Sequence, residues 1–374
     1  MFRTRREVCE LFVRSASASH GAFRAPVGNP QRRPAYRASL LLLCVLQTRL
    51  CPVDSLLQIG SGQTSVGVRA LLARFYSYLP PRIAAMELEM VCGVRLSHTT
   101  VHRQAQAVGE QLQKECTDKE ASWLVSQPLP PRHKAPQMHV SMDGVMIHVD
   151  KRWREVKLGV VYERGSRGGV ERANYYATLS PSATFGRRVR MLAQSEGADY
   201  CRKLAVVADG GEWIWQECGR HFTQSVQILD FYHACEHLWE VSRARFGEES
   251  EAGKQWMKQQ KDRLLTNKVR AVIADLQKWQ PLKEAHKEIQ RKQVNYLQTH
   301  QRRMRYETFE QQGYHIGSGV IEAGCKSVVQ GRLKRAGMRW NAKGAEATLH
   351  LCAQWSSTQS QDFTDAARKS CRPV

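Results

Sequence analysis

Three aspartates follow short apolar runs at points where buried strands are expected to end. Asp143 ends the run 138–143, Asp209 follows residues 203–208, and Asp230 follows residues 225–229. Runs of this length and composition are typical of buried strands in an α/β sheet. Carboxylates at strand ends face the crevice in which open α/β sheets bind ligands. Three of them in one chain indicate a site where carboxylates hold a metal.

A fourth acid could join this site from a helix. In the stretch Gly317-Ser-Gly-Val-Ile-Glu, Ser318 can cap a helix whose first turn holds Glu322. An acid there could reach the aspartates, although Glu322 and Lys326 could equally form only a surface ion pair. Carboxylates suit Mg²⁺ or Mn²⁺, and two such ions roughly 3.5–4 Å apart promote phosphodiester cleavage.

Two histidines follow Asp230 on one face of a predicted helix. His233 and His237 are four residues apart and could bind zinc, but no cysteine stands at a suitable spacing. Packing, or a hydrogen bond from His233 to Asp230, is the favoured interpretation. The residues alone leave open whether Asp209 or Asp230 is the second acid of the site.

The composition favours a nucleic-acid partner. The 374 residues include 56 Lys and Arg against 35 Asp and Glu, a formal net charge of +21. Such a surplus predicts attraction to a polyanion, although solvated basic faces remain the plain alternative. Eleven cysteines without a C-x-x-C pair fit a reducing cytoplasm. The apolar run 39–46 is too short to span a bilayer, so no membrane partner is expected.

The first third of the chain is predicted to be basic and then helical. Residues 1–60 are expected to be poorly ordered. Residues 61–127 should form helices, with Gly93 in a turn and Ser97 capping the helix that follows. This layout matches a helix-turn-helix, but ordinary packing helices would look the same. In the first case, the residues offered to DNA are Thr99, Thr100 and Arg103.

A Pro-rich linker over 128–136 precedes a predicted catalytic core that begins at 137–239. Three strands in a meander, followed by alternating helix and strand, are the order of the ribonuclease-H-like fold, an α/β fold with a mixed sheet. In that fold the first and fourth strands are neighbours, which would bring Asp143 close to Asp209. Residues 240–315 should form a basic helical insertion, whose charged face could contact phosphates or simply be solvated.

The last part of the predicted core, 316–356, holds Glu322 and a basic track; a C-terminal tail, 357–374, follows. The basic track consists of residues that are expected to bind DNA: Lys326, Arg332, Lys334, Arg335 and Arg339. Trp340 closes it. A tryptophan is most often a core residue, but Trp340 is the best candidate in this chain to stack on an unpaired base.

Four motifs resemble bacterial insertion-sequence transposases of the ISKra type, which are relatives of the Mutator-like DDE transposases. The resemblance covers about residues 51–356. The motifs are Asp143-Gly, Asp209-Gly-Gly-Glu-Trp-Ile, Leu229-Asp-Phe-Tyr-His-Ala-Cys-Glu-His-Leu-Trp, and Gly317-Ser-Gly-Val-Ile-Glu-Ala-Gly-Cys-Lys with Arg332-Leu-Lys-Arg-Ala-Gly-Met-Arg-Trp.

The resemblance implies that Asp143, Asp209 and Glu322 are the catalytic triad and hold two Mg²⁺ or Mn²⁺ ions. It implies that Asp230 and His233 match an accessory acid-x-x-His motif. The implied activity is metal-dependent cleavage and transfer of double-stranded DNA at transposon ends and target. The implied setting is a homo-oligomer on DNA in the bacterial cytoplasm, associated with the nucleoid. Two alternatives are a related nuclease that does not join strands and a non-catalytic, transposon-derived DNA-binding protein.

Overall fold

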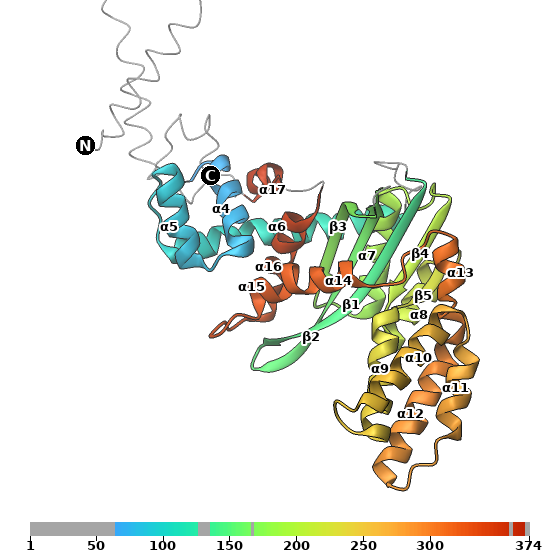
Figure 1. The fold of residues 1–374 in the computed structure, drawn as a ribbon. Coiled ribbons are helices and arrows are strands. Elements are labelled where there is room, and N and C mark those ends of the chain that lie inside the picture. The colour runs from blue at the N-terminus through green and yellow to red at the C-terminus, as the bar shows by residue number, and fades with distance from the viewer. Residues whose placement is uncertain (1–63, 126–134, 166–167, 359–361, 371–374) are drawn as a thin grey trace, which may run out of the picture. The chain divides into compact units, whose positions relative to one another are not determined.

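The computed structural model describes residues 64–125, 135–165, 168–358 and 362–370. The predicted basic segment 1–60 and linker residues 128–134 lie outside this range. At the centre is a five-stranded mixed sheet with the strand order β3-β2-β1-β4-β5 (Figure 1). The strands are β1 (Gln137–Val149), β2 (Arg152–Arg164), β3 (Val170–Thr178), β4 (Lys203–Ala208) and β5 (Val226–Leu229).

The strand pairing confirms the α/β prediction and the central place of the first strand. β1, β2 and β3 form an antiparallel meander, and β4 and β5 continue the sheet in parallel with β1. Val140 of β1 pairs with Val206 of β4, as expected for adjacent first and fourth strands. The valine-rich β4 is buried from Ala205 to Ala208, which suits a strand covered on both faces.

One predicted strand boundary is wrong. β1 does not end at Asp143 but continues to Val149, paired with β2 throughout. Beyond Asp143, buried Val145, Ile147 and Val149 alternate with exposed residues, which is the pattern of a strand covered on one face. Asp143 therefore lies within a long hairpin strand rather than at its tip.

Two layers of helices cover the sheet. Helices α7 (Ser182–Ser195) and α8 (Glu212–His221) follow β3 and β4, and α7 packs on β2 and β3. α14 (Gly319–Gly324), the π-helical turns η3 (Cys325–Gln330), α15 (Gly331–Leu333) and α16 (Ala342–Ser356) form the other layer. On β2, Val161 belongs to the core under α7, whereas Leu158 and Val160 belong to the core under α14. Because side chains alternate along a strand, the two cores lie on opposite faces.

The predicted helical insertion is helical. It is formed by α9 (Phe231–Phe246), α10 (Glu251–Leu265), α11 (Val269–Lys278) and α12 (Glu284–His300), then the single turn η2 (Gln301–Arg303) and α13 (Tyr306–Gln311). Trp256, Leu264, Val272 and Leu276 are buried at helical spacing and join the core under β4 and β5. Figure 1 shows these helices as a yellow-to-orange bundle.

The N-terminal helices are α4 (Val66–Tyr78), α5 (Pro81–Cys92) and α6 (His98–Val125). Gly93 ends α5 with a φ of 65°, and the Ser97 hydroxyl accepts a hydrogen bond from the Thr100 amide at 3.2 Å, as predicted. The predicted C-terminal tail contains a helix, α17 (Thr364–Lys369), which packs on α4. Phe363 and Leu351 of the C-terminal part complete the core of α4–α6. Among the described helices, none is long and apolar enough to cross a membrane.

Candidate active site

Asp143 and Asp209 occupy equivalent places on neighbouring strands. The parallel pairing of β1 and β4 reaches Val140 and Val206, and each aspartate lies three residues further on. Each fixes its carboxylate with a nearby backbone amide: Gly144 N donates to Asp143 Oδ1 at 2.6 Å, and Gly211 N donates to Asp209 Oδ1 at 2.9 Å. The two carboxylates interact electrostatically, as the fold prediction required.

Glu322 approaches from the helical layer above β1 and β2. It lies in the first turn of α14, where its side chain is exposed and Oε1 accepts a hydrogen bond from the Ser318 hydroxyl at 3.3 Å. Gly324 lets this helix lie close to the sheet, since a Cβ there would be only 2.7 Å from a ring carbon of Tyr175. A larger residue there would force either the Tyr175 ring or α14 to shift.

Cys325, which was not predicted as a site residue, lies beside Asp143. Its thiol donates a hydrogen bond to Asp143 Oδ2, with Sγ and Oδ2 3.1 Å apart. Burial raises the pKa of this thiol far above its ordinary value, and the carboxylates of Asp143, Glu322 and Asp209 each raise it further. Cys325 begins the π-helical turns, a feature frequent at functional sites. The thiol therefore contacts Asp143 and interacts electrostatically with Glu322 and Asp209.

The surroundings of Asp143 disfavour its negative charge on balance. Burial raises the pKa of Asp143; hydrogen bonds from Cys325 and Gly144 oppose the shift, and the Asp209 carboxylate adds to it. A bound cation would relieve this repulsion. In the described ranges, however, no three His, Cys, Asp or Glu side chains already form a group that could hold a metal ion. The Mg²⁺ or Mn²⁺ ligation by Asp143, Asp209 and Glu322 stays a prediction.

Asp230 has a different role from Asp209. It is 1% exposed, and both of its carboxylate oxygens accept backbone hydrogen bonds. Oδ1 caps α9 by accepting from His233 N, and Oδ2 accepts from Ser318 N at the start of α14. Both donors are backbone amides of segments that Asp230 holds together. Asp230 therefore ties α9 to the segment that carries Glu322, which favours Asp209 as the second acid.

The two histidines on α9 lie side by side, with 5.0 Å between ring centroids, but contact different partners. The predicted bond between His233 and Asp230 exists, but it comes from the backbone amide. The His233 ring is 3.3 Å from Glu236 Oε2 and interacts electrostatically with Asp143. His237 Nδ1 is 2.6 Å from Gln293 Oε1, and its ring stacks on Tyr296 with 3.7 Å between centroids.

The prediction that Arg332 belongs to the DNA-contacting basic track is wrong. Arg332 is 1% exposed, its Nε donates to the Tyr76 carbonyl at 2.8 Å, and its guanidinium lies over the Tyr76 ring. It joins α15 to α4 and cannot reach DNA. Arg335 is exposed but also donates to a carbonyl of α4, that of Tyr78, at 2.9 Å. Three members remain exposed without an ion pair in the described part of the chain: Lys326, Lys334 and Arg339.

Trp340 is held by the core rather than presented freely. Its indole Nε1 donates to the Leu333 carbonyl at 3.0 Å, and the Arg332 guanidinium carbon is 5.1 Å from its ring centroid. Its carbonyl also accepts from Asp150 N at 2.9 Å, at the tip of the β1–β2 hairpin. The ring is half-buried, so base stacking by Trp340 stays a prediction.

The predicted DNA-reading residues lie at the start of α6. Thr99 and Arg103 are exposed and Thr100 is half-buried. Both threonine hydroxyls are 2.9 Å from the Ser97 hydroxyl, so they take part in the cap of this helix. A role in DNA contact stays a prediction.

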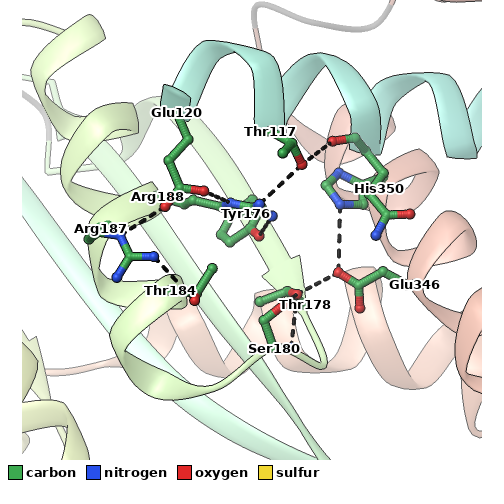
Figure 2. Close-up of polar contacts among 11 residues, drawn as sticks. Thr117, Glu120, Tyr176, Thr178, Ser180, Thr184, Arg187, Arg188, Glu346 and His350 are labelled. Atoms are coloured by element: carbon green, nitrogen blue, oxygen red, sulfur yellow. Dashed lines mark hydrogen bonds and ion pairs between the residues drawn. The ribbon is translucent and has the colours of Figure 1, made fainter. Parts of the chain in front are cut away.

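A second cluster of acids lies between α6, β3, α7 and α16, and Figure 2 shows that each acid there faces donors. Glu120 of α6 accepts hydrogen bonds from Arg187 Nε at 2.9 Å and from Arg188 Nε at 2.7 Å. Glu346 of α16 accepts from the Thr178 hydroxyl and the Leu179 amide, with His350 Nε2 3.7 Å away (Figure 2). This cluster joins helices to the sheet.

Comparison with known proteins places the chain in a family but not in a functional class. No curated protein matches it. The model of one family, described as "Uncharacterised protein family (UPF0236)", matches residues 54–364. This range holds β1 to β5, the helical insertion, all the acids of the candidate site and the basic residues after Glu322. The chain therefore belongs to the uncharacterised protein family UPF0236.

Proposed function

We propose that this chain is a DDE-type DNA transposase, which cuts and joins DNA strands with divalent metal ions. The observation that carries the proposal is the equivalent placement of Asp143 and Asp209 beyond the paired residues of β1 and β4, with Glu322 on the helix α14 that packs on β1 and β2. An antiparallel meander extended by two parallel strands beside β1 is the sheet order of the ribonuclease-H-like fold, and it supports this reading. The motif resemblance to ISKra-type transposases adds the strand-joining step to the proposal.

The donor set fits Mg²⁺ or Mn²⁺. Three carboxylates offer hard oxygen ligands, and the repulsion that raises the Asp143 pKa would fall when a cation binds. Asp143, Asp209 and Glu322 would hold the ions, which supply charge stabilisation for displacement at phosphorus. The Gly144 and Gly211 amides orient the two aspartates before any ligand arrives. Asp230 fixes the start of α14, and thereby the helix of Glu322.

The charge distribution supports DNA as the substrate. The chain carries a formal net charge of +21, and exposed Lys326, Lys334 and Arg339 follow Glu322 in the chain. Contacts of lysine and arginine with phosphates would hold the duplex, whereas the carboxylates serve only the reacting phosphodiester. A homo-oligomer that pairs two DNA ends is part of the proposal.

A strand-transfer assay tests the proposal. The substrate is a labelled DNA end with a free 3′-hydroxyl, taken from the repeats that flank the gene, with a target plasmid and Mg²⁺. A joined product supports a transposase, whereas hydrolysis alone supports the nuclease alternative. Tight binding without either product, at Mg²⁺ and Mn²⁺ concentrations that saturate related enzymes, supports the DNA-binding alternative.

Binding must also respond to salt if phosphates hold the DNA. With six to ten phosphate contacts, the affinity should fall by roughly 10³–10⁵ between 50 and 200 mM salt. Fluorescence anisotropy with the same labelled DNA measures this fall. If the affinity does not change over this range, the interpretation that the positive charge binds DNA phosphates is wrong.

A further inference from the structure

Two adjoining cavities begin beside Asp209 and extend along α8 and α12. The first, of about 580 Å³, is lined by Gly210, Trp215, Tyr296, His300 and Lys292, among others. The second, of about 510 Å³, is lined by Arg302, Arg303 and Arg305 together with residues of β5. Thr299 and Arg303 line both, so the cavities adjoin. We call them together the side groove.

Flat side chains line the side groove in an unbroken series. The rings of Tyr296 and His300 are 4.8 Å apart between centroids, and those of His300 and Trp215 are 6.2 Å apart. The guanidinium carbon of Arg303 lies 4.2 Å from the Trp215 ring centroid, so the guanidinium covers the indole. Aromatic rings and guanidinium planes are the surfaces on which unpaired bases stack.

Two buried polar atoms of this lining have no hydrogen-bond partner in the described part of the chain: Trp215 Nε1 and Tyr296 Oη. Trp215 is only 7% exposed. A Cβ on Gly210 would be 2.8 Å from Tyr296 Oη, which places this hydroxyl beside the loop that carries Asp209. Burial raises the pKa of Tyr296, and the Asp209 carboxylate raises it further, so the hydroxyl stays a donor. Base edges carry the acceptors that such donors lack.

Exposed cations complete the groove. Lys292, Arg302 and Arg305 are exposed, and none forms an ion pair with an acid in the described residues. The lining also includes an acid, Glu212, whose Oε1 accepts a hydrogen bond from Gln216 at 3.0 Å. Three unpaired cations against one acid leave the groove positive, as a phosphate backbone requires.

We infer that the side groove binds one unpaired DNA strand next to the reacting phosphodiester. In a duplex, neighbouring base pairs cover the faces of each base, so bases could not reach rings set within a groove. An unpaired strand can place its phosphates on the cations and stack its bases on the half-buried Tyr296 ring and Arg303 guanidinium, which the buried rings of His300 and Trp215 support. The inference rests on the proposed function only where it calls the DNA at Asp209 the substrate.

Binding of a fluorescent 15-nucleotide oligothymidylate, measured by anisotropy in EDTA at low salt, tests the inference. The groove variant is Arg302→Ala/Arg305→Ala, in which both changes affect exposed side chains. The charge-matched control is Lys258→Ala/Arg270→Ala, which changes two exposed cations of α10 and α11 outside the groove. The groove variant should bind the oligonucleotide about tenfold more weakly than the control variant does. Tyr296→Phe, which removes only the hydroxyl, should weaken binding by about threefold.

Binding of a blunt duplex with the same number of nucleotides separates strand binding from general charge. It should weaken equally in the groove and control variants. Equal loss of oligothymidylate binding in both variants, or a loss confined to the duplex, would overturn the inference. Because EDTA prevents cleavage, failure of the proposed function would leave this result readable. Normal Mg²⁺-dependent cleavage beside groove-independent strand binding would reject the groove alone.

Discussion

The candidate active site and the cluster around Glu120 and Glu346 balance their charges in opposite ways. Burial acts to raise the pKa of Glu120, but hydrogen bonds from Arg188 and Arg187 outweigh it and hold the pKa below its ordinary value. The pKa of Glu346 is lowered in the same manner, by His350, Thr178 and the Leu179 amide against burial. At Asp143 burial prevails, because the neighbouring acid Asp209 adds repulsion and, among the described residues, a thiol is the one side-chain donor to its carboxylate.

This difference in how the negative charges are stabilised distinguishes the acids that hold the fold together from the acids proposed to bind metal. An acid that meets arginine, histidine and backbone donors has its charge satisfied by the fold and can hold helices together. Acidic side chains that lie near one another repel each other and lack donors that stabilise their negative charge. A bound cation would stabilise them. The comparison therefore supports the proposal that Asp143, Asp209 and Glu322, rather than Glu120 and Glu346, bind the metal ions.

The largest effect is expected from Asp209→Asn. Loss of the ligand charge should reduce cleavage on the order of 10³-fold or more, with DNA binding and melting temperature nearly unchanged.

Asp230→Asn should instead lower the free energy of unfolding by about 2 kcal/mol, because the amide cannot accept both backbone N–H bonds. Its activity should fall but remain detectable. Cleavage kinetics and urea unfolding of both variants measure the contrast; total inactivation by Asp230→Asn, with Asp209→Asn still active, would reverse the assignment.

Glu120→Gln tests the structural side of the comparison. It leaves the buried Arg188 without its ionic partner and should lower the free energy of unfolding by about 3 kcal/mol. Cleavage per folded molecule should stay the same. Glu89→Gln, which breaks an exposed pair with Arg95, is the matched control and should cost less than about 1 kcal/mol. Similar losses in the two variants, measured by urea unfolding, would show that Glu120 is not a buried anchor.

His139 is a buried titratable side chain of a third kind, because it stays neutral. The pH dependence of the free energy of unfolding tests this. Burial, with smaller effects of His315 and Arg164, lowers the pKa of His139 to about 4, against 6.5 when unfolded. Between these values the unfolded chain binds a proton that the folded chain does not, so stability falls as the pH falls. The loss from pH 7 to pH 4 should reach about 3 kcal/mol at most for this group.

Urea unfolding at several pH values measures this dependence. His139→Gln should flatten it, whereas His98→Gln, which changes an exposed histidine, should leave it unchanged. An unaltered slope in His139→Gln would mean that His139 is not held neutral.

The smallest effect is expected at Cys325, which acts through Asp143. Cys325→Ala removes the donor to Asp143 Oδ2 and should slow cleavage by about threefold to tenfold. Cys325→Ser keeps a donor at that place and should restore most of the rate. If serine and alanine are equally slow, Cys325 is only a packing residue.

The presence of the five strands could be predicted because their apolar runs are short and bounded by polar residues, although β1 continues beyond its predicted end at Asp143. The adjacency of Asp143 and Asp209 needed the fold, since 66 residues separate them in the chain. Cys325 escaped prediction because a π-helical turn leaves no pattern in the residues around it. Arg332 was misjudged because a charged residue within a basic run is usually exposed, and only long-range packing on Tyr76 buries it. The same kind of long-range packing joins α17 to α4.

Binding of Mn²⁺, followed by electron paramagnetic resonance and calorimetry without DNA, tests the central claim most directly. The folded protein should bind Mn²⁺, and Asp143→Asn and Asp209→Asn should each weaken this binding by about tenfold or more. Glu346→Gln, a change in the compensated cluster, should leave it unchanged. Equal Mn²⁺ affinity in the parent chain and in the Asp143→Asn/Asp209→Asn double variant would contradict the claim that these carboxylates form a metal site.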